Sequence, residues 1–554
     1  MGENTQTPKK LEIAIKKTLL SDVVGNESMS VITPGGRLQV RWDERANATA
    51  MGQLAFFAEF LELSGLFERW VADCPLAYTS GNAPAVRDVL GTWMLSILDG
   101  HCRYAHIASL RGDAVAPEIL NMSKIISDES LRRALAHIAP APNDKDSDEQ
   151  RLAKEAQVEK AGKWMKQALL ESVQYALNTP WILDCDTTIK TLFGHQSGAE
   201  ISYNPKKPGR PSHTVHTYWM ANLRLVLHAE LQPGKSHSAA HSLPGMIDLI
   251  LRLPKEKRPK LVRGDIAFGT ERVMCDLEEI DQSYLFKLKQ TANVKRLVER
   301  QWRKSEWRDV GQGWQACEDR LQLMGWTGSR RVIVMRHAVA GELVVETGKA
   351  PRSGSKAAKA KAEEKRQLAL QFIDENEPSK LWKYAVLVTN SSYAVEHMGQ
   401  LYRDRADCEN GFDELKNQWG WGGYSTQDIE RCNLSAQAVG LIYNWWSWYV
   451  RLAHPQARLE AITSRPLLLA AVGKITEHAG QKRILLSLTH AAASQVKSLI
   501  SNVREGLQHI RATAAQFHES LRWKALVDYI VMKILVAKLK NTTRPLAPPI
   551  LQTG

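Results

Sequence analysis

The sequence predicts a mixed α/β core that carries a β-rich insertion and lies between helical N-terminal and C-terminal regions. Apolar residues recur at spacings of three and four from about residue 37 to 138, as on an amphipathic helix. Beyond Pro180, short apolar runs alternate with helical segments, which is typical of a sheet with connecting helices. At 554 residues, the chain is long enough for about three to five domains. We predict these regions: 1–36, 37–178, 179–289, 290–390, 391–453 and 454–554.

The charge balance indicates a polyanionic partner, with nucleic acid ahead of membrane. The chain has 73 Lys and Arg against 60 Asp and Glu, a net charge of +13. Ten of these excess charges fall in residues 451–554, although a solvated helical face is the alternative interpretation of that region. The most apolar stretch, 438–450, is shorter than the roughly 20 residues that cross a bilayer. Seven scattered cysteines without a Cys-x-x-Cys pair favour a reducing, cytoplasmic location over a disulfide framework.

The N-terminal part is expected to begin with a flexible arm, residues 1–36, that ends at Pro34-Gly35-Gly36. The helical region 37–178 that follows is the expected DNA-binding domain. Near its end, Ser127 and two acidic residues precede Arg132 and Arg133, a pattern typical of a capped helix. This helix either reads DNA or is an ordinary surface helix. A linker over 140–147 then leads into one long helix that ends near Leu177.

Two strands of the predicted core end in carboxylates. Strands are expected at 181–187, 217–231, 260–265 and 284–288, with helices at 239–252 and 269–280. Asp184 and Asp186 share one face of the first strand, and Asp265 ends the third. The carboxyl ends of strands in an α/β sheet face the crevice in which ligands bind. A capping or turn role is the alternative for each aspartate taken alone.

The region from 290 to 390 is expected to be a β-rich insertion. Strands are predicted at 307–310, 322–326, 331–335 and 343–346, followed by a basic low-complexity loop over 350–366. A strand at 384–389 leads back to helices that fill the rest of the chain. Tryptophans are frequent in and after the insertion, where they either pack a core or offer stacking surfaces: Trp302, Trp307, Trp314, Trp326, Trp419 and Trp421, with Tyr424.

One later helix carries four functional groups on a single face. Tyr402, Arg405, Glu409 and Lys416 stand at offsets 0, 3, 7 and 14, which fall within an arc of roughly 60° on a helix. A solvated ion pair would explain Arg405 and Glu409 by themselves. The complete set of an aromatic hydroxyl, a guanidinium, a carboxylate and an ammonium favours a functional stripe.

These motifs together resemble the DDE transposases of bacterial insertion sequences. The spacing Tyr-x2-Arg-x3-Glu-x6-Lys is similar to that family's signature around its catalytic glutamate, and Asp186-Thr187-Thr188 and Arg263-Gly264-Asp265 are similar to its two aspartate motifs. The gaps agree as well, with 79 residues between the aspartates and 144 from Asp265 to Glu409. The resemblance covers roughly residues 40 to 450. It implies a ribonuclease-H-like core with the β-rich insertion in the second gap.

The resemblance also implies a reaction and its partners. Such enzymes bind transposon ends, cleave DNA and join 3′-hydroxyl ends to target DNA with two Mg²⁺ ions, for which Mn²⁺ substitutes. Asp186, Asp265 and Glu409 would be the catalytic metal ligands, with Asp184 left open as an alternative first ligand. The expected partners are double-stranded DNA with terminal inverted repeats, target DNA and a second copy of the chain, in a bacterial cytoplasm at the nucleoid. Tyr402, Arg405 and Lys416 would contact the DNA backbone.

A further DNA candidate is the loop 205–211, whose Lys206, Lys207 and Arg210 are similar to a minor-groove arm of the Gly-Arg-Pro type. An ordinary loop is equally compatible with the sequence. Two rival functions remain: a structure-selective nuclease on the same fold, and a domesticated non-catalytic DNA-binding protein. Carboxylates at all three positions argue against the second rival, because such a protein has no reason to keep them.

Overall fold

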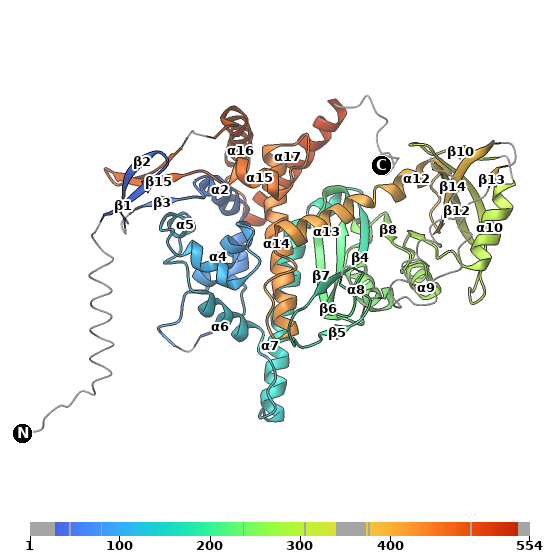
Figure 1. Cartoon of the computed structure of the whole chain (residues 1–554), viewed down its shortest axis with the longest axis horizontal. Helices are drawn as coiled ribbons and strands as arrows, with labels where there is room; N and C mark the ends of the chain where they lie inside the picture. Colours follow the sequence, from blue (N-terminus) through green and yellow to red (C-terminus); the bar gives the residue numbers. More distant parts are fainter. Residues whose placement is uncertain are drawn as a thin grey trace, which may run out of the picture.

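The structure, a computed structural model, describes residues 28–41, 43, 46–78, 80–205, 207–236, 238–303, 306–339, 373–374, 377–487 and 490–540. Helix α14 (Ile429–Ala453) runs through the middle of the molecule, with the N-terminal helices on one side and a large sheet on the other (Figure 1). The strands that continue this sheet into the predicted insertion lie at the far end (Figure 1).

The centre of the large sheet is built from five strands in the order β7-β6-β4-β8-β9. The first three are antiparallel neighbours, whereas β4, β8 and β9 run parallel to one another. Helix α8 (Ala239–Arg252) contacts β4 and α9 (Glu271–Glu279), and η4 (Lys255–Lys257) follows it. The strands are β4 (Ile182–Thr191), β6 (Pro211–Met220), β7 (Leu225–Pro233), β8 (Leu261–Gly264) and β9 (Tyr284–Lys287), with a short edge strand β5 (Glu200–Ile201) on β6.

The strand predicted over 217–231 is wrong, because two antiparallel strands occupy this region. The chain turns at η3 (Ala221–Leu223) and at Arg224, whose φ of 48° is left-handed. A left-handed turn position is usually occupied by glycine or asparagine, whereas position 224 is an arginine. The helices and the other core strands lie where the sequence predicts them, to within a few residues at each end.

Helices α7 (Asp148–Val173) and α14 cover β7. Helix α7 begins at a capping box, in which the Ser147 side chain accepts from the Gln150 backbone and the Gln150 side chain accepts from Ser147 N. The side chain of Asn444, buried in α14, satisfies both backbone groups of Val226 on β7. Helix α14 is buried along nearly its whole length, since it lies between the sheet and the other helices.

The N-terminal region is mainly helical but also contains strands, so the expected arm over 1–36 is partly corrected. Residues 29–40 form a hairpin that turns at Pro34-Gly35. Residues 1–27 lie outside the described residues. The elements are β1 (Met29–Thr33), β2 (Gly36–Val40), β3 (Ala48–Thr49), α2 (Leu54–Ser64), α3 (Leu66–Ala72), α4 (Val86–Leu98), η1 (Tyr104–Leu110), α5 (Val115–Ile119), α6 (Asp128–Ile138) and, after α7, η2 (Ala176–Asn178).

The predicted insertion extends the central sheet instead of forming a separate one. Strand β14 (Glu377–Thr389) pairs antiparallel with β9, and β12 (Arg330–Val339), β11 (Trp314–Leu321) and β10 (Arg308–Asp309) follow in that order. Helix α10 (Ala292–Trp302) and the short β13 (Ile373–Asp374) complete it. The strand predicted at 322–326 is wrong, because these residues include the turn between β11 and β12. The expected strand 343–346 and basic loop 350–366 lie outside the described residues.

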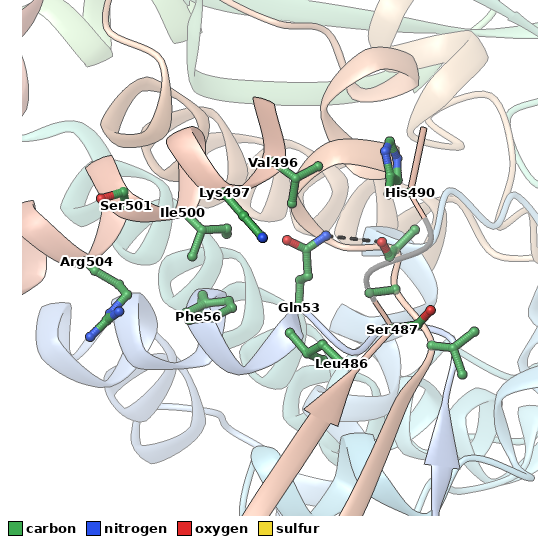
Figure 2. A pocket seen from close by; sticks show the side chains of 13 residues that line it. Gln53, Phe56, Leu486, Ser487, His490, Val496, Lys497, Ile500, Ser501 and Arg504 are labelled. Atoms are coloured by element: carbon green, nitrogen blue, oxygen red, sulfur yellow. Dashed lines mark hydrogen bonds between the residues drawn. The ribbon is translucent and has the colours of Figure 1, made fainter. Parts of the chain in front are cut away.

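The C-terminal region is likewise not all-helical. Strands β15 (Gly473–His478) and β16 (Gln481–Leu486) form a hairpin that joins β3 of the N-terminal region. Helices α16 (Ala493–Ala514) and α17 (Glu519–Lys540) pack against each other and against α14, and α15 (Ala461–Leu468) contacts α16. An apolar cavity of about 570 Å³ lies at this junction. Gln53, one of the residues that line it (Figure 2), donates to the backbone of Ala470.

Much of the positive charge of this C-terminal region is engaged within the protein. Arg451 is buried and donates to Leu223 O, and Arg458 pairs with the buried Glu414. Arg511 reaches Glu59 on α2 at 3.1 Å. These cations tie the C-terminal helices to the rest of the chain, which leaves fewer of them for DNA than the sequence suggests. Within the described residues, no helix is long and apolar enough to cross a membrane.

Candidate active site

The register of the parallel strands brings the two aspartates together. Asp184 on β4 lies opposite Arg263 on β8, an offset of 79 residues. The same offset, continued two residues further, places Asp186 beside Asp265. Neighbouring strands are about 4.8 Å apart. Asp186 and Asp265 therefore lie side by side where β8 ends. Strand β4 continues past Asp186 to Thr191, so the prediction that this strand ends at its aspartates is wrong.

The signature residues do not share one continuous helix, which corrects the predicted single stripe. Helix α12 (Val395–Arg403) ends at Asp404, and α13 (Ala406–Gln418) begins after Arg405. Both Asp404 and Arg405 keep right-handed helical φ and ψ, so the interruption is mild. Tyr402 thus belongs to the last turn of α12, whereas Glu409 and Lys416 belong to α13. A periodicity argument finds the spacing but cannot detect such a break.

Arg405 joins the helix to the sheet. Its guanidinium lies 3.4 Å from the Asp186 carboxylate and 3.1 Å from that of Glu409. The Arg405 side chain is 7% exposed and Glu409 is 65% exposed, so the solvated ion pair considered as an alternative applies to the Glu409 end only. The first and third carboxylates of the motif therefore converge on one buried cation. A direct contact with DNA phosphates is not available to Arg405 in this arrangement.

Asp184 has a different role from Asp186 in the structure. Its two carboxylate oxygens accept from Nε and Nη2 of Arg263 at 2.6 and 2.7 Å, and both side chains are almost fully buried. Arg263 also donates to Leu401 O on α12. This bidentate pair links β4, β8 and α12. Both oxygens of Asp184 are therefore engaged in this ion pair.

The local electrostatics follow from burial and crowding of carboxylates. Burial raises the pKa of Asp186 from 3.8 to about 6, with Arg405 acting against this shift and the charges of Asp265 and Glu409 adding to it. Burial likewise raises the pKa of Tyr402 to about 12, again with all three carboxylates contributing. The charges of all three carboxylates therefore act on Tyr402.

Lys287 is a residue of this site that the sequence analysis missed. It ends β9, and the register of β8 with β9 places it beside Asp265. Burial lowers the pKa of Lys287, an effect strengthened by Lys383 and opposed by Asp265 and Glu409. The run Tyr-Leu-Phe-Lys shows the same signal that identified Asp265, since a charged residue ends an apolar strand. The register of the three adjacent parallel strands thus brings together Asp186 within β4, Asp265 just after β8 and Lys287 at the end of β9.

The other predicted DNA contacts lie elsewhere. Lys416 and Arg132 line one cavity, about 520 Å³ in volume, with the Arg132 guanidinium 5.1 Å from the Tyr104 ring. Arg133 is exposed on α6 and pairs with Glu129 at 3.0 Å. Lys207 and Arg210 both lie over the ring of Phe193. Lys206 lies outside the described residues.

The tryptophans considered as stacking surfaces mostly pack the interior. Trp419, Trp421 and Tyr424 are each at most 2% exposed, so they belong to the core. In the extended sheet, Arg336 lies 4.1 Å from the Trp307 ring and 4.2 Å from that of Trp382. The packing interpretation therefore holds for Trp419 and Trp421.

The donor set at the carboxylates suits a hard divalent cation. Among the described residues, no three His, Cys, Asp or Glu side chains are arranged to bind one metal ion as they stand. Asp186, Asp265 and Glu409 supply only oxygen donors, which Mg²⁺ and Mn²⁺ prefer. The Glu409 side chain is 65% exposed and is held by Arg405 alone among the contacts seen. It has the freedom to turn toward the aspartates.

Comparison with known proteins agrees with a DNA-acting enzyme. Residues 81–350 match the family model described as Transposase DDE domain group 1, a range that includes Asp186 and Asp265 and ends before Glu409. No curated protein matches the chain. Among solved structures, a piggyBac transposase synaptic complex with hairpin DNA is similar at 11% identity and a TM-score of 0.34, over 91% of this chain and 92% of that one. The family match supports a transposase function.

Proposed function

We propose that this protein is a DNA transposase that binds transposon ends, cleaves phosphodiester bonds and joins 3′-hydroxyl ends to target DNA. The observation that carries this proposal is that Asp186 and Glu409 approach the same buried guanidinium, Arg405, while the strand register puts Asp265 beside Asp186. The family match over residues 81–350 supports it independently. The partners would be double-stranded transposon ends, target DNA and a second copy of the chain. The bacterial insertion-sequence branch, with its Tyr-x2-Arg-x3-Glu-x6-Lys signature, is part of the proposal.

The proposal includes a ribonuclease-H-like catalytic core. Three antiparallel strands followed by two parallel ones, in the order β7-β6-β4-β8-β9, support this assignment. The order puts the first and second aspartates on adjacent central strands, and α13 brings Glu409 to them from a distant part of the chain. The division of the chain into domains stays a prediction.

Each residue of the site has a distinct proposed role. Asp186, Asp265 and Glu409 would hold divalent cations, Mg²⁺ or Mn²⁺, which stabilise the entering and leaving oxygens of an in-line displacement at phosphorus. Arg405 would limit repulsion between the carboxylates in the free protein. Lys287, at the next strand end, would meet a non-bridging phosphate oxygen, because its ammonium would otherwise have little compensation for its burial.

The experiment that tests this function is a reaction with defined DNA. The protein would be incubated with the ends of its element, target DNA and Mg²⁺, and the products would be sequenced. Joined products establish a transposase. DNA cleavage without joining, even when a pre-cut end is supplied, would instead identify the rival nuclease. Binding without cleavage at any divalent metal concentration would identify the non-catalytic DNA-binding protein.

We predict that cation binding depends on pH through Asp186. With a pKa near 6, Asp186 is mostly protonated below that pH, so a cation must displace a proton. The apparent affinity for Mn²⁺ should fall about tenfold per pH unit below pH 6 and level off above about pH 7. Electron paramagnetic resonance of free Mn²⁺ between pH 5 and 8 measures this. A constant affinity down to pH 5 would contradict it.

The raised pKa of Asp186 also predicts how the folding stability of the metal-free protein depends on pH. A carboxyl whose pKa rises from 3.8 to about 6 on folding favours the folded state when protonated. The stabilising contribution of Asp186 is therefore complete below about pH 4 and is lost as the pH rises through about 6.

Arg405→Gln should move the midpoint of Mn²⁺ binding to higher pH, because Arg405 is the main neighbour that lowers the pKa of Asp186. A midpoint that stays in place would show that Arg405 has no such role.

A further inference from the structure

The helix that carries Glu409 is held at its other end by the C-terminal region. Glu414 lies on α13 five residues beyond Glu409, about 7.5 Å further along the helix axis and about 140° around it. The Glu414 side chain is 1% exposed, whereas that of Glu409 is 65% exposed. Helix α13 therefore presents one carboxylate to the candidate active site and holds another in the interior, on nearly the opposite face.

Glu414 is a buried carboxylate whose two oxygens are both engaged. Its Oε1 accepts from Trp419 Nε1 at 3.2 Å and from Ala461 N at 3.1 Å, and its Oε2 accepts from Arg458. Arg458 is itself buried and also donates to Tyr443 Oη on α14 at 2.6 Å. Burial of a carboxylate is costly unless it is paired and hydrogen-bonded, and these donors meet both conditions. Glu414 thus connects α13 with α14 and with the start of α15.

Helices α13 and α15 cap each other. The first backbone N–H groups of a helix have no partner within the helix. In α15, Ala461 N donates to Glu414 and Ile462 N donates to Gln418 Oε1 at 2.7 Å, so two α13 side chains one turn apart serve as the caps. In return, Arg465 Nη1 donates to Gln418 O at the end of α13 at 2.5 Å. Hydrogen bonds are directional, so this reciprocal capping fixes how α13 is rotated about its axis.

The rotation of α13 decides where Glu409 points. Among the interactions seen, Arg405 alone contacts the Glu409 carboxylate, so the position of this carboxylate follows the backbone of α13. A helix with its side chains has a radius of roughly 5–6 Å, so a rotation of about 10° displaces a side-chain end by about 1 Å. A misplacement of about 1 Å at a reacting centre lowers a rate roughly hundredfold.

Apolar packing does not fix this rotation as tightly. Phe412 and Leu415 of α13 are buried, but hydrophobic contact is non-directional. A buried ion pair, for its part, adds little net stability compared with apolar side chains of similar volume. The contacts of Glu414 and Gln418 therefore contribute direction more than stability.

We propose that Glu414 and Gln418 are positioning residues for Glu409. Through α15, they hold α13 at the rotation from which the Glu409 carboxylate reaches a divalent cation beside Asp186 and Asp265. The C-terminal region thus helps to build the metal site. This inference rests on the proposed function for the reaction, but the positioning itself is measurable as cation binding without DNA.

The main test compares cation binding and cleavage in Glu414→Gln. This variant keeps the shape of the side chain but leaves Arg458 without its counter-charge. Above about pH 7, its affinity for Mn²⁺, measured by electron paramagnetic resonance of the free ion, should fall about tenfold. Single-turnover cleavage of the ends of the element should fall roughly 10- to 100-fold, with DNA binding within about twofold of the wild type. A folded Glu414→Gln protein with wild-type Mn²⁺ affinity and cleavage rate would overturn the proposal.

Gln418→Ala tests the same role without leaving a buried charge unpaired. It removes the bond from Ile462 N and the bond to Glu460, whose Oε2 accepts from Gln418 Nε2 at 2.8 Å. The Mn²⁺ affinity should fall about two- to tenfold, the contribution of one hydrogen bond. This variant decides the question if Glu414→Gln does not fold. Wild-type Mn²⁺ affinity in Gln418→Ala would contradict the positioning role.

Glu171→Gln is the control that separates positioning from stability. Glu171 on α7 pairs with Arg69 on α3 at 3.3 Å, a partly buried ion pair that includes no residue of α13. This variant should lower the midpoint of urea denaturation, yet bind Mn²⁺ and cleave DNA as the wild type does. An equal loss of Mn²⁺ affinity at an equal shift of the midpoint would show that stability alone explains the effect, and would overturn the proposal. Failure of the proposed function would appear differently, as wild-type protein that binds Mn²⁺ but cuts no DNA, and the Mn²⁺ affinities of the variants would still decide the positioning role.

Discussion

Replacing Asp186, Asp265 or Glu409 by its amide is expected to abolish DNA cleavage and joining while leaving end binding nearly unchanged. Each substitution keeps the shape of the side chain but removes one negative charge from a site that must hold divalent cations. We expect the rate to fall by roughly three orders of magnitude or more. End binding should persist, because it depends mainly on basic surfaces outside the carboxylates.

The measurement is single-turnover cleavage of labelled ends, together with a binding titration on the same DNA. Asp413→Asn is the matched control: Asp413 lies on the same helix as Glu409, is exposed and accepts only from Asn417 among the bonds seen. It should cleave at the wild-type rate. Full activity of Glu409→Gln would overturn the transposase proposal, since no other carboxylate on α13 pairs with Arg405.

Asp184→Asn is expected to destabilise the fold by about 3–5 kcal/mol, because it leaves the Arg263 guanidinium buried without its counter-charge. Asp184 is fully buried and Arg263 is 1% exposed, so water cannot replace the lost interaction. The pair also holds α12, through Leu401, against the sheet. Loss of activity in this variant should therefore follow from unfolding, not from a missing metal ligand.

Urea denaturation monitored by tryptophan fluorescence measures this effect. The double variant Asp184→Leu, Arg263→Met should recover much of the lost stability, since apolar side chains of similar size can replace a buried ion pair. Asp186→Asn offers the opposite control, because neutralising a carboxyl that burial already disfavours should not destabilise the fold at neutral pH. An Asp184→Asn protein that is stable but inactive would contradict this structural role and would indicate that Asp184 is a metal ligand.

Short-range sequence patterns, such as helical periodicity and capping residues, predicted the elements that depend on neighbouring residues. Helix α8 begins and ends where its periodicity predicts, and Ser127 caps α6 by accepting from Ser130 N at 3.1 Å. The prediction failed where the decisive feature involves distant residues. The hairpin of β15 and β16 forms because it pairs with β3, more than 400 residues earlier. The turn at Arg224 is stabilised by the pairing of β6 with β7, so the local sequence does not predict it.

The sequence by itself predicted which residues would carry the proposed chemistry. The order and spacing of Asp186, Asp265 and Glu409 can be read from the chain, because each aspartate follows a short apolar run and the glutamate lies in a helical segment with a recognisable pattern. Only the tertiary structure decided what each charge contacts. The parallel register sends Asp184 to Arg263 and Asp186 to Asp265, and the break before α13 directs Arg405 to the carboxylates. Register and burial depend on packing between segments far apart in sequence, and these long-range contacts set the charge and pKa of the site.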